Sequence, residues 1–378
     1  MSVLDKTDRD VAPFSPESWS LTHTQDAPGY RPEDARPANP GILHVVESFA
    51  GGVAAAVHDY VRSTPHLEHH LLYATRADAP LSETALLGFD SVEEFERNHF
   101  KRVRQVRRVA KARRCDVVHA HSSLGGAYTR VAVSKSEVTI AYTPHCYSYE
   151  REDLSGPKRA AYRAIEWMLA WNTSVFAACS PREAELSRRS MPSNSVVYVP
   201  HVKPRGRGHT RRNSPVRTVL ASGRLGAQKD PEFFAQLSET VQATRDDIDF
   251  VWVGGGDQEI VDRLRAAGVR VTGWLDRRAV LREMAAADLY VHVAKWEGYP
   301  VTILEAVSAG LPVIVRDAPS MEYFPEEARV DSLDAAARMI SVMDDASVRS
   351  LQHAKWAEWT AMNNTANQLE ALNSAYAA

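Results

Sequence analysis

The chain passes twice through the same alternation of short apolar runs and amphipathic stretches. In the first half the apolar runs cover residues 42–46, 69–74, 116–119, 139–143, 175–178 and 196–199. In the second half they cover 217–221, 250–253, 269–272, 289–293 and a run from Val313, with helical patterns at 231–243, 261–267 and 278–287. Strands that alternate with helices form parallel sheets through right-handed crossovers. The pattern therefore predicts an α/β fold of two doubly wound, Rossmann-like domains that face a cleft, with ligands at the carboxyl ends of the strands.

The length of 378 residues and a composition that is 44% hydrophobic and 25% charged agree with two globular domains. Residues 1–40 hold six of the 20 prolines and no apolar signal core, so we expect a poorly ordered arm there. Between 201 and 217 the chain has six Lys or Arg and no acid, which is typical of a linker. The expected domains are 41–204 and 217–346, joined by a linker over 205–216 and followed by a helical segment over 347–378.

Charge and cysteine content narrow the classes of function. The formal net charge is −3, which gives no general affinity for polyanions. Three cysteines make no disulfide framework, and a reducing cytosol fits them. No run of about 18 apolar residues occurs, so a membrane-spanning helix is not expected. We expect a cytoplasmic protein.

The segment 296–306 contains two glutamates eight positions apart, Glu297 and Glu305. Pro300 suits the first position of a helix that Gly310 would end. Free backbone N–H groups at Val301, Thr302 and Ile303 would suit a phosphate. The two carboxylates could flank one ligand that carries both phosphate and hydroxyls, and a nucleotide sugar is such a ligand.

This segment resembles the signature of the retaining, GT-B glycosyltransferases of family 4, although many members have glycine at the position of Pro300. The resemblance implies a GT-B fold with a C-terminal helix that crosses back to the N-terminal domain. It also implies that Glu297 contacts the donor sugar and that Glu305 holds the ribose. The donor phosphates would lie at the helix start, at Val301, Thr302, Ile303 and Leu304.

Residues 221–230 resemble a second motif of the family, in which Arg224 and Lys229 hold the donor diphosphate. Two fixed cations would stabilise the charge that develops on a departing nucleoside diphosphate without a metal ion. Asp230 stands where glycine is usual. The alternative interpretation is a surface pair of basic residues.

Three glycine-containing turns are assigned to the donor by the same resemblance. Gly51 and Gly52 lie between the first strand and the first helix, where backbone N–H groups can approach a phosphate or sugar. Gly255 belongs to a glycine turn beside the donor, and Trp274 follows the strand whose loop meets the nucleotide base. Ordinary tight turns would also account for these glycines, and no dinucleotide-binding G-x-G-x-x-G is present.

Histidines end two strands of the first domain. His145 matches the family histidine that lies beside the donor sugar. A Cys146–His145 nucleophilic pair is disfavoured, because neighbouring loop residues rarely point at each other and no third group is evident. His121, Ser122 and Ser123 are expected on the acceptor side, whereas His119 is expected in the core. His119 and His121 share a strand face, but no further ligand is evident nearby, so we expect no metal and no cofactor besides the nucleotide-sugar co-substrate.

Residues 95–115 form a basic, helical pattern with nine cations and one acid. Such a helix could bind an anionic membrane or a lipid pyrophosphate, and it could equally be a solvated helix whose apolar stripe packs on the sheet. The charge is local and no nucleic-acid motif accompanies it, so nucleic acid is not an expected partner.

Together these features predict a metal-independent, retaining hexosyltransferase that uses a nucleotide-diphosphate sugar. The segment 42–52 is similar to transferases of bacterial surface-polysaccharide assembly, which suggests a glycan or polyprenyl-diphosphate-linked acceptor and a peripheral position on the inner membrane face. Two alternatives stay open at this point. One is a nucleotide-sugar epimerase on the same fold, and the other is a non-catalytic subunit that binds nucleotide sugar or lipid.

Overall fold

The computed structural model describes residues 40–75, 83–190, 194–206 and 215–378, and the strands in them form two parallel sheets. The first sheet has seven strands in the order β3-β2-β1-β4-β5-β6-β7. Their bounds are β1 Gly41–Val46, β2 Glu68–Tyr73, β3 Ser91–Glu94, β4 Val117–His121, β5 Thr139–Thr143, β6 Val175–Ala178 and β7 Ser195–Tyr198. The sequence pattern missed β3, whose alternating burial and charged residues lack an apolar run.

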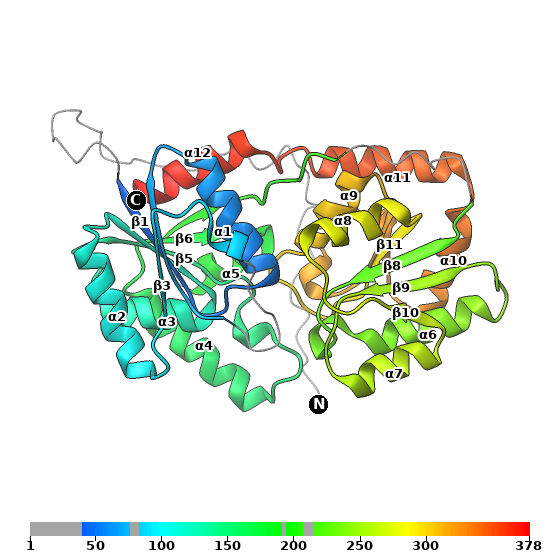
Figure 1. Cartoon of the computed structure of the whole chain (residues 1–378), viewed down its shortest axis with the longest axis horizontal. Helices are drawn as coiled ribbons and strands as arrows, with labels where there is room; N and C mark the ends of the chain where they lie inside the picture. The colour runs from blue at the N-terminus through cyan, green and yellow to red at the C-terminus, as the bar shows by residue number, and fades with distance from the viewer. Residues whose placement is uncertain (1–39, 76–82, 191–193, 207–214) are drawn as a thin grey trace, which may run out of the picture. The chain divides into compact units, whose positions relative to one another are not determined.

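Five helices connect these strands: α1 Gly51–Ser63, α2 His99–Ala112, α3 Ser122–Ala132, α4 Gly156–Ala170 and α5 Pro181–Ser190. The strand order reverses direction at β1, so right-handed crossovers place α1 on one face of the sheet and α2 to α5 on the other. Neighbouring helices from α2 to α5 pack against each other in chain order (Figure 1). Ligands of doubly wound sheets bind at such a switch point, beyond the carboxyl ends of β1 and β4.

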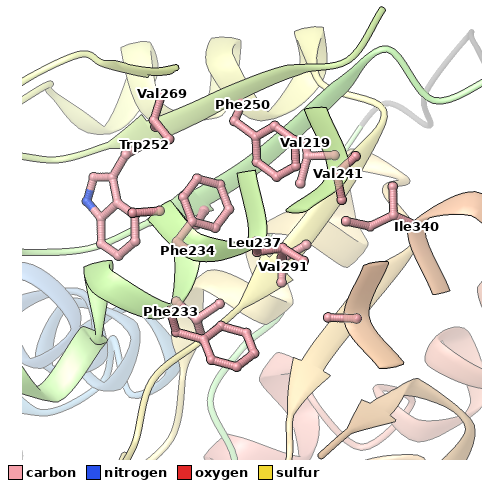
Figure 2. Packing of buried hydrophobic residues seen from close by; sticks show 14 of the residues in the cluster. Val219, Phe233, Phe234, Leu237, Val241, Phe250, Trp252, Val269, Val291 and Ile340 are labelled. Carbon is pink, nitrogen blue, oxygen red and sulfur yellow. The ribbon is translucent and has the colours of Figure 1, made fainter. Parts of the chain in front are cut away.

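The second sheet has six strands in the order β10-β9-β8-β11-β12-β13. The strands are β8 Thr218–Ser222, β9 Asp249–Val253, β10 Val269–Val271, β11 Leu289–His292, β12 Val313–Arg316 and β13 Arg329–Val330. The helices are α6 Pro231–Gln242, α7 Gln258–Ala266, α8 Arg277–Ala286, α9 Val301–Ala309 and α10 Leu333–Val342. On one face, aromatic residues of α6 and β9, among them Phe234, Phe250 and Trp252, pack into an apolar core that Ile340 of α10 closes (Figure 2).

The C-terminal segment is two helices, α11 Ala346–Trp359 and α12 Thr365–Tyr376. Trp356 of α11 packs in the core of the second sheet. Helix α12 returns to the first sheet, where Ala371, Leu372 and Ala375 pack with Ala56 and Tyr60 of α1. The predicted C-terminal crossing helix is therefore confirmed, and α12 makes the crossing.

The expected arm at 1–40 lies, apart from Pro40, outside the described residues, as does most of the expected linker. No helix within the described ranges is long and apolar enough to cross a bilayer.

Candidate active site

The two residues predicted to contact the donor sugar and its diphosphate, Glu297 and Lys229, form an ion pair. Lys229 ends the short 3₁₀ turn Ala227–Lys229 after β8, and Glu297 lies in the loop between β11 and α9. Gln228 donates a hydrogen bond of 3.3 Å to the same carboxylate, and the backbone N–H of Glu297 donates 3.1 Å to the Ser320 hydroxyl. The side chain and the backbone of Glu297 are thus both held, and the residue is 8% exposed.

His292 stands beside this pair and was missed by the sequence analysis. Its Nε2 lies 3.6 Å from Oε1 of Glu297, and it is a buried nitrogen without a hydrogen-bond partner among the described residues. Burial lowers the pKa of His292 well below its usual range, with Lys229 adding to the shift, so the ring is neutral. Its place at the carboxyl end of β11, five residues before Glu297, is the signal that could have indicated it.

The backbone amides predicted to bind phosphate lie at the start of α9, but one of them already has a partner. The helix begins at Val301 with Pro300 as its N-cap, and the N–H of Ile303 donates 2.9 Å to the Pro300 carbonyl. The amide of Ile303 is therefore already engaged. The side chain of Leu304 is fully buried beside Cys179 and Tyr299, so only its backbone could reach a ligand.

The glycine start of α1 lies against the start of α9. Helix α1 begins at Gly51, whose φ is +54°, so the two glycines open the helix and do not precede it. A Cβ placed on Gly52 would lie 3.9 Å from Cγ2 of Val301. The N-termini of two helices from different sheets therefore meet, and both have positive dipole ends that favour an anion.

Glu305, the second glutamate of the motif, does not join the Lys229–Glu297 pair. It is buried on α9 and forms a 3.3 Å ion pair with Arg277 at the start of α8. Burial raises the pKa of Glu305, Arg277 opposes that shift, and Asp59 of α1 adds to it. The hydroxyl of Tyr290 on β11 lies 2.9 Å from the Thr302 hydroxyl and 3.1 Å from that of Ser222.

Arg224, Gly255 and Trp274 lie on neighbouring loops at the carboxyl ends of β8, β9 and β10. The N–H of Leu225 donates 2.9 Å to the Gly255 carbonyl, which holds the first two loops together, and Arg224 beside it is exposed. A Cβ on Gly255 would come within 3.0 Å of the Trp274 ring. The ring, 47% exposed, therefore covers a position that only glycine leaves open.

The loop of Glu297 touches the loop of His145 across the two sheets. A Cβ on Gly298 would lie 2.5 Å from the backbone nitrogen of Cys146 and 2.6 Å from the carbonyl carbon of His145, so glycine is required there. His145 and Cys146 have φ of +51° and +87°, values that L-residues seldom adopt. Such strain persists only where the surroundings enforce it.

Glu183 of α5 holds this strained loop, a role that no sequence pattern indicated. Its two carboxylate oxygens accept from the backbone N–H of Cys146, at 2.9 Å, and of Cys179, at 3.0 Å. Burial raises the pKa of Glu183 to about 7. Burial also raises the pKa of the Cys146 thiol, which agrees with its exclusion as a nucleophile.

His121, predicted on the acceptor side, is fully buried in a group of histidines. Its Nδ1 lies 3.0 Å from Nε2 of His145, and its Nε2 lies 3.2 Å from Nδ1 of His44. Ser122 begins α3 with a φ of +62°, and the Ser123 hydroxyl is 2.8 Å from that of Ser148. Only the two serines therefore lie where an acceptor could reach, while the ring of His121 supports His145.

The structure corrects the expectation that no third ligand stands near His119 and His121. Because β1 pairs with β4 in a register that sets His44 beside His119, one nitrogen from each of His44, His119 and His121 lies within 4.8 Å of the others. Both nitrogens of all three rings already have hydrogen-bond partners in the protein. The arrangement favours hydrogen bonding over metal coordination.

Two family models match the chain. The glycosyl transferase 4-like domain matches residues 51–201, and the glycosyl transferases group 1 model matches 216–345. HepE of Anabaena, solved with UDP and glucose, shares the fold at a TM-score of 0.71 and 16% identity over 89% of this chain and 99% of HepE.

Two of the curated relatives are bacterial proteins. An uncharacterized 41.2 kDa protein of the Klebsiella pneumoniae cps region is 20% identical over 88% of this chain and 97% of that protein. The Escherichia coli UDP-Gal:alpha-D-GlcNAc-diphosphoundecaprenol alpha-1,3-galactosyltransferase is 27% identical over 55% of this chain and 59% of that enzyme. The chain thus matches somewhat more than half of that characterised relative.

The chain belongs to the group 1, family 4 glycosyltransferases with the GT-B fold. It is a nucleotide-sugar-dependent glycosyltransferase with relatives in cell-surface glycan synthesis.

Proposed function

We propose that this protein transfers a hexose, with retention of anomeric configuration, from a nucleotide-diphosphate sugar to a polyprenyl-diphosphate-linked acceptor in surface-polysaccharide assembly. The observation that carries the proposal is the ion pair between Lys229 and Glu297, because Glu297 lies in the loop that touches His145. The galactosyltransferase relative named above supports the lipid-linked acceptor.

The chemistry follows from the charges of the site. A bound diphosphate draws Lys229 away from Glu297, and Arg224 together with the amides at the start of α9 adds positive potential. Glu297, released from its ion pair, then accepts hydrogen bonds from sugar hydroxyls. Glu305 accepts from the ribose, and the acceptor approaches from the side of Ser122 and Ser123.

A donor panel tests this function. Purified protein is incubated with uridine and guanosine diphosphate sugars and a polyprenyl-diphosphate sugar acceptor, and nucleoside diphosphate release is measured. The product anomer is assigned by NMR coupling constants. Release that depends on the acceptor and gives the donor's anomeric configuration supports the proposal. An inverted product or an epimerised donor without acceptor would contradict it.

A further inference from the structure

Helix α4 has its apolar side toward solvent. In residues 162–171 lie five of the thirteen large hydrophobic side chains exposed in the described part of the chain, namely Tyr162, Ile165, Trp167, Met168 and Trp171. At 100° per residue, Ile165, Trp167, Met168 and Trp171 share one arc with exposed Pro157, Ala160, Ala161 and Ala164. This arc contains no charged residue.

The side of α4 that faces the protein buries Ala170 and one charged residue, Glu166. Glu166 is buried and bonds the Arg130 guanidinium at 2.8 Å and the Tyr142 hydroxyl at 2.9 Å. A soluble amphipathic helix has the opposite arrangement, with its apolar stripe inward. A contiguous exposed apolar patch that is bordered by polar residues marks an interaction site.

Cations lie next to both edges of the apolar arc. Helix α4 carries Lys158, Arg159 and Arg163, and α3 separates it from the basic helix α2 on the same face of the sheet. Arg104, Arg107 and Lys111 of α2 are exposed and have no acidic partner within ion-pair distance among the described residues. Exposed tryptophans flanked by basic residues suit the boundary between lipid headgroups and acyl chains.

We propose that the exposed face of α4, together with the α2 cations, docks the protein on an anionic lipid bilayer. A second copy fits less well, because it would offer the same positive charge. The position suits the lipid-linked acceptor of the proposed function. The residues before α4 carry Ser148, which contacts Ser123, and Arg159 donates 2.8 Å to the Tyr149 carbonyl.

Vesicle co-sedimentation of the full chain tests this docking. We expect pelleting with phosphatidylglycerol vesicles and little with phosphatidylcholine alone. The variant Trp167→Ser/Trp171→Ser should lower the partition coefficient by about tenfold or more. The matched control is Leu351→Ser on α11, which is equally exposed, at 64% against 63% for Trp171, and should bind as wild type.

Three results would overturn the docking. The first is unchanged vesicle binding by the tryptophan variant, and the second is an equal loss of binding in the Leu351 control. The third is a wild-type protein that binds no lipid and forms a dimer in analytical ultracentrifugation, while the tryptophan variant is monomeric. A nucleoside diphosphate should raise the melting temperature of wild type and variant alike. Failure of that shift in both proteins would count against the proposed function and leave the lipid result standing.

A second inference comes from four histidines joined in single file. Nε2 of His44 lies 3.0 Å from Nδ1 of His69, and the chain continues through His121 to His145. At the far end, Nε2 of His69 lies 3.1 Å from the carbonyl oxygen of Thr64. The Thr64 hydroxyl donates to the Tyr60 carbonyl, so it also accepts from His69.

The Thr64 carbonyl determines which nitrogen carries the proton in each of the four hydrogen-bonded histidines. A carbonyl only accepts, so Nε2 of His69 carries the proton and Nδ1 of His69 is an acceptor. Nε2 of His44 must then donate to it, which leaves Nδ1 of His44 to accept from Nε2 of His121. Nδ1 of His121 is then an acceptor, so Nε2 of His145 donates to it, and Nδ1 of His145 carries a lone pair.

We infer that His69, His44 and His121 are positioning residues that lock His145 in its neutral Nε2–H tautomer. Burial lowers the pKa of His44, His121 and His145 well below the usual range, which agrees with neutral rings. No hydrogen bond reaches Nδ1 of His145 from any described residue, so this nitrogen is left to accept from a ligand hydroxyl. The hydrogen bond from a ligand hydroxyl to Nδ1 rests on the proposed function, whereas the assignment of the tautomer does not.

NMR of protein with ¹⁵N-labelled imidazoles reads the tautomer directly. In the wild type at neutral pH we expect an unprotonated Nδ1 and a protonated Nε2 for His145. The variant His44→Phe should give a mixture of both tautomers of His145. The variant His70→Gln changes a neighbouring histidine that is not one of the four hydrogen-bonded rings, and it should leave the tautomer of His145 unchanged. A protonated Nδ1 in the wild type would overturn the inference even if His44→Phe fails to fold. Zinc-induced shifts of His44, His119 and His121 would overturn it in favour of a metal site.

Discussion

The two sheets have similar topologies and opposite ways of building a site. In the second sheet, charged residues on loops surround an apolar core, and Lys229 and Glu297, each on a motif of its own, meet in an ion pair. In the first sheet, polar groups enter the interior itself, as buried histidines, the Arg130–Glu166 pair and Glu183. The second sheet thus offers charge to the ligand, whereas the first uses buried polar groups to fix loop geometry.

The largest expected effect comes from breaking the buried pair of the first sheet. In Arg130→Met, Glu166 keeps only the hydrogen bond from Tyr142 and is left as an unpaired buried carboxylate. Removing one partner of a buried ion pair typically costs about 3–5 kcal/mol. Urea unfolding should show this loss, and Arg130→Met/Glu166→Gln should recover part of it. An unchanged midpoint for Arg130→Met would show that the pair does not stabilise the domain.

The corresponding change in the second sheet should affect catalysis and spare stability. Glu297→Gln keeps the size of the side chain and removes its charge, so we expect kcat to fall by about 10²–10³-fold. Nucleotide-induced thermal stabilisation should persist, because Lys229 remains. The exposed glutamine variant Glu259→Gln on α7 is the control. Full transfer activity in Glu297→Gln would refute the role proposed for this carboxylate.

Glu183 predicts a pH dependence of stability. Its pKa is raised from 4.5 to about 7 in the folded protein, so the native state holds its proton longer than the unfolded state. The free energy of unfolding should therefore be highest below pH 4.5, as far as this group is concerned, and decline by about 3 kcal/mol as pH rises through 7. Glu183→Gln should remove this decline, so the difference in unfolding free energy between wild type and variant should change with pH in that window. A parallel pair of curves would exclude Glu183 as the source.

Where the two loops touch, Gly298→Ala should disturb both sheets. The new methyl group would meet the backbone of His145 and Cys146. Overpacking of this kind costs about 1–3 kcal/mol, and a shifted loop should lower activity as well. Calorimetry and transfer assays on this variant can be compared with Gly156→Ala, whose added Cβ meets nothing within 4 Å. Equal behaviour of the two variants would refute close packing of the loops.

Much of the second sheet could be predicted because its signals are contiguous. Val313 and its neighbours form a strand as expected, Gly310 ends α9 with a φ of +82°, and residues 231–243 correspond to α6. Glu305 shows the limit of this reasoning. The spacing of eight residues suggested that the two glutamates share one ligand, yet Glu305 pairs with Arg277 and Glu297 pairs with Lys229. Their roles in donor binding stay predictions.

The site of the first sheet was harder to predict from the sequence, because it depends on the register in which the strands pair. His44 and His119 are 75 residues apart, and only the pairing of β1 with β4 sets them side by side. The inward Glu166 and outward Trp167 of α4 are likewise decided by which face meets the sheet.

By itself the sequence determined the alternation of elements, the two parallel sheets and the family, because these follow from local periodicity and short motifs. The tertiary structure alone decided which buried polar groups meet, as with Glu183 and the amides of Cys146 and Cys179. The physical reason is that a buried polar group must find a partner, and chain packing, not sequence distance, determines which partner is within reach.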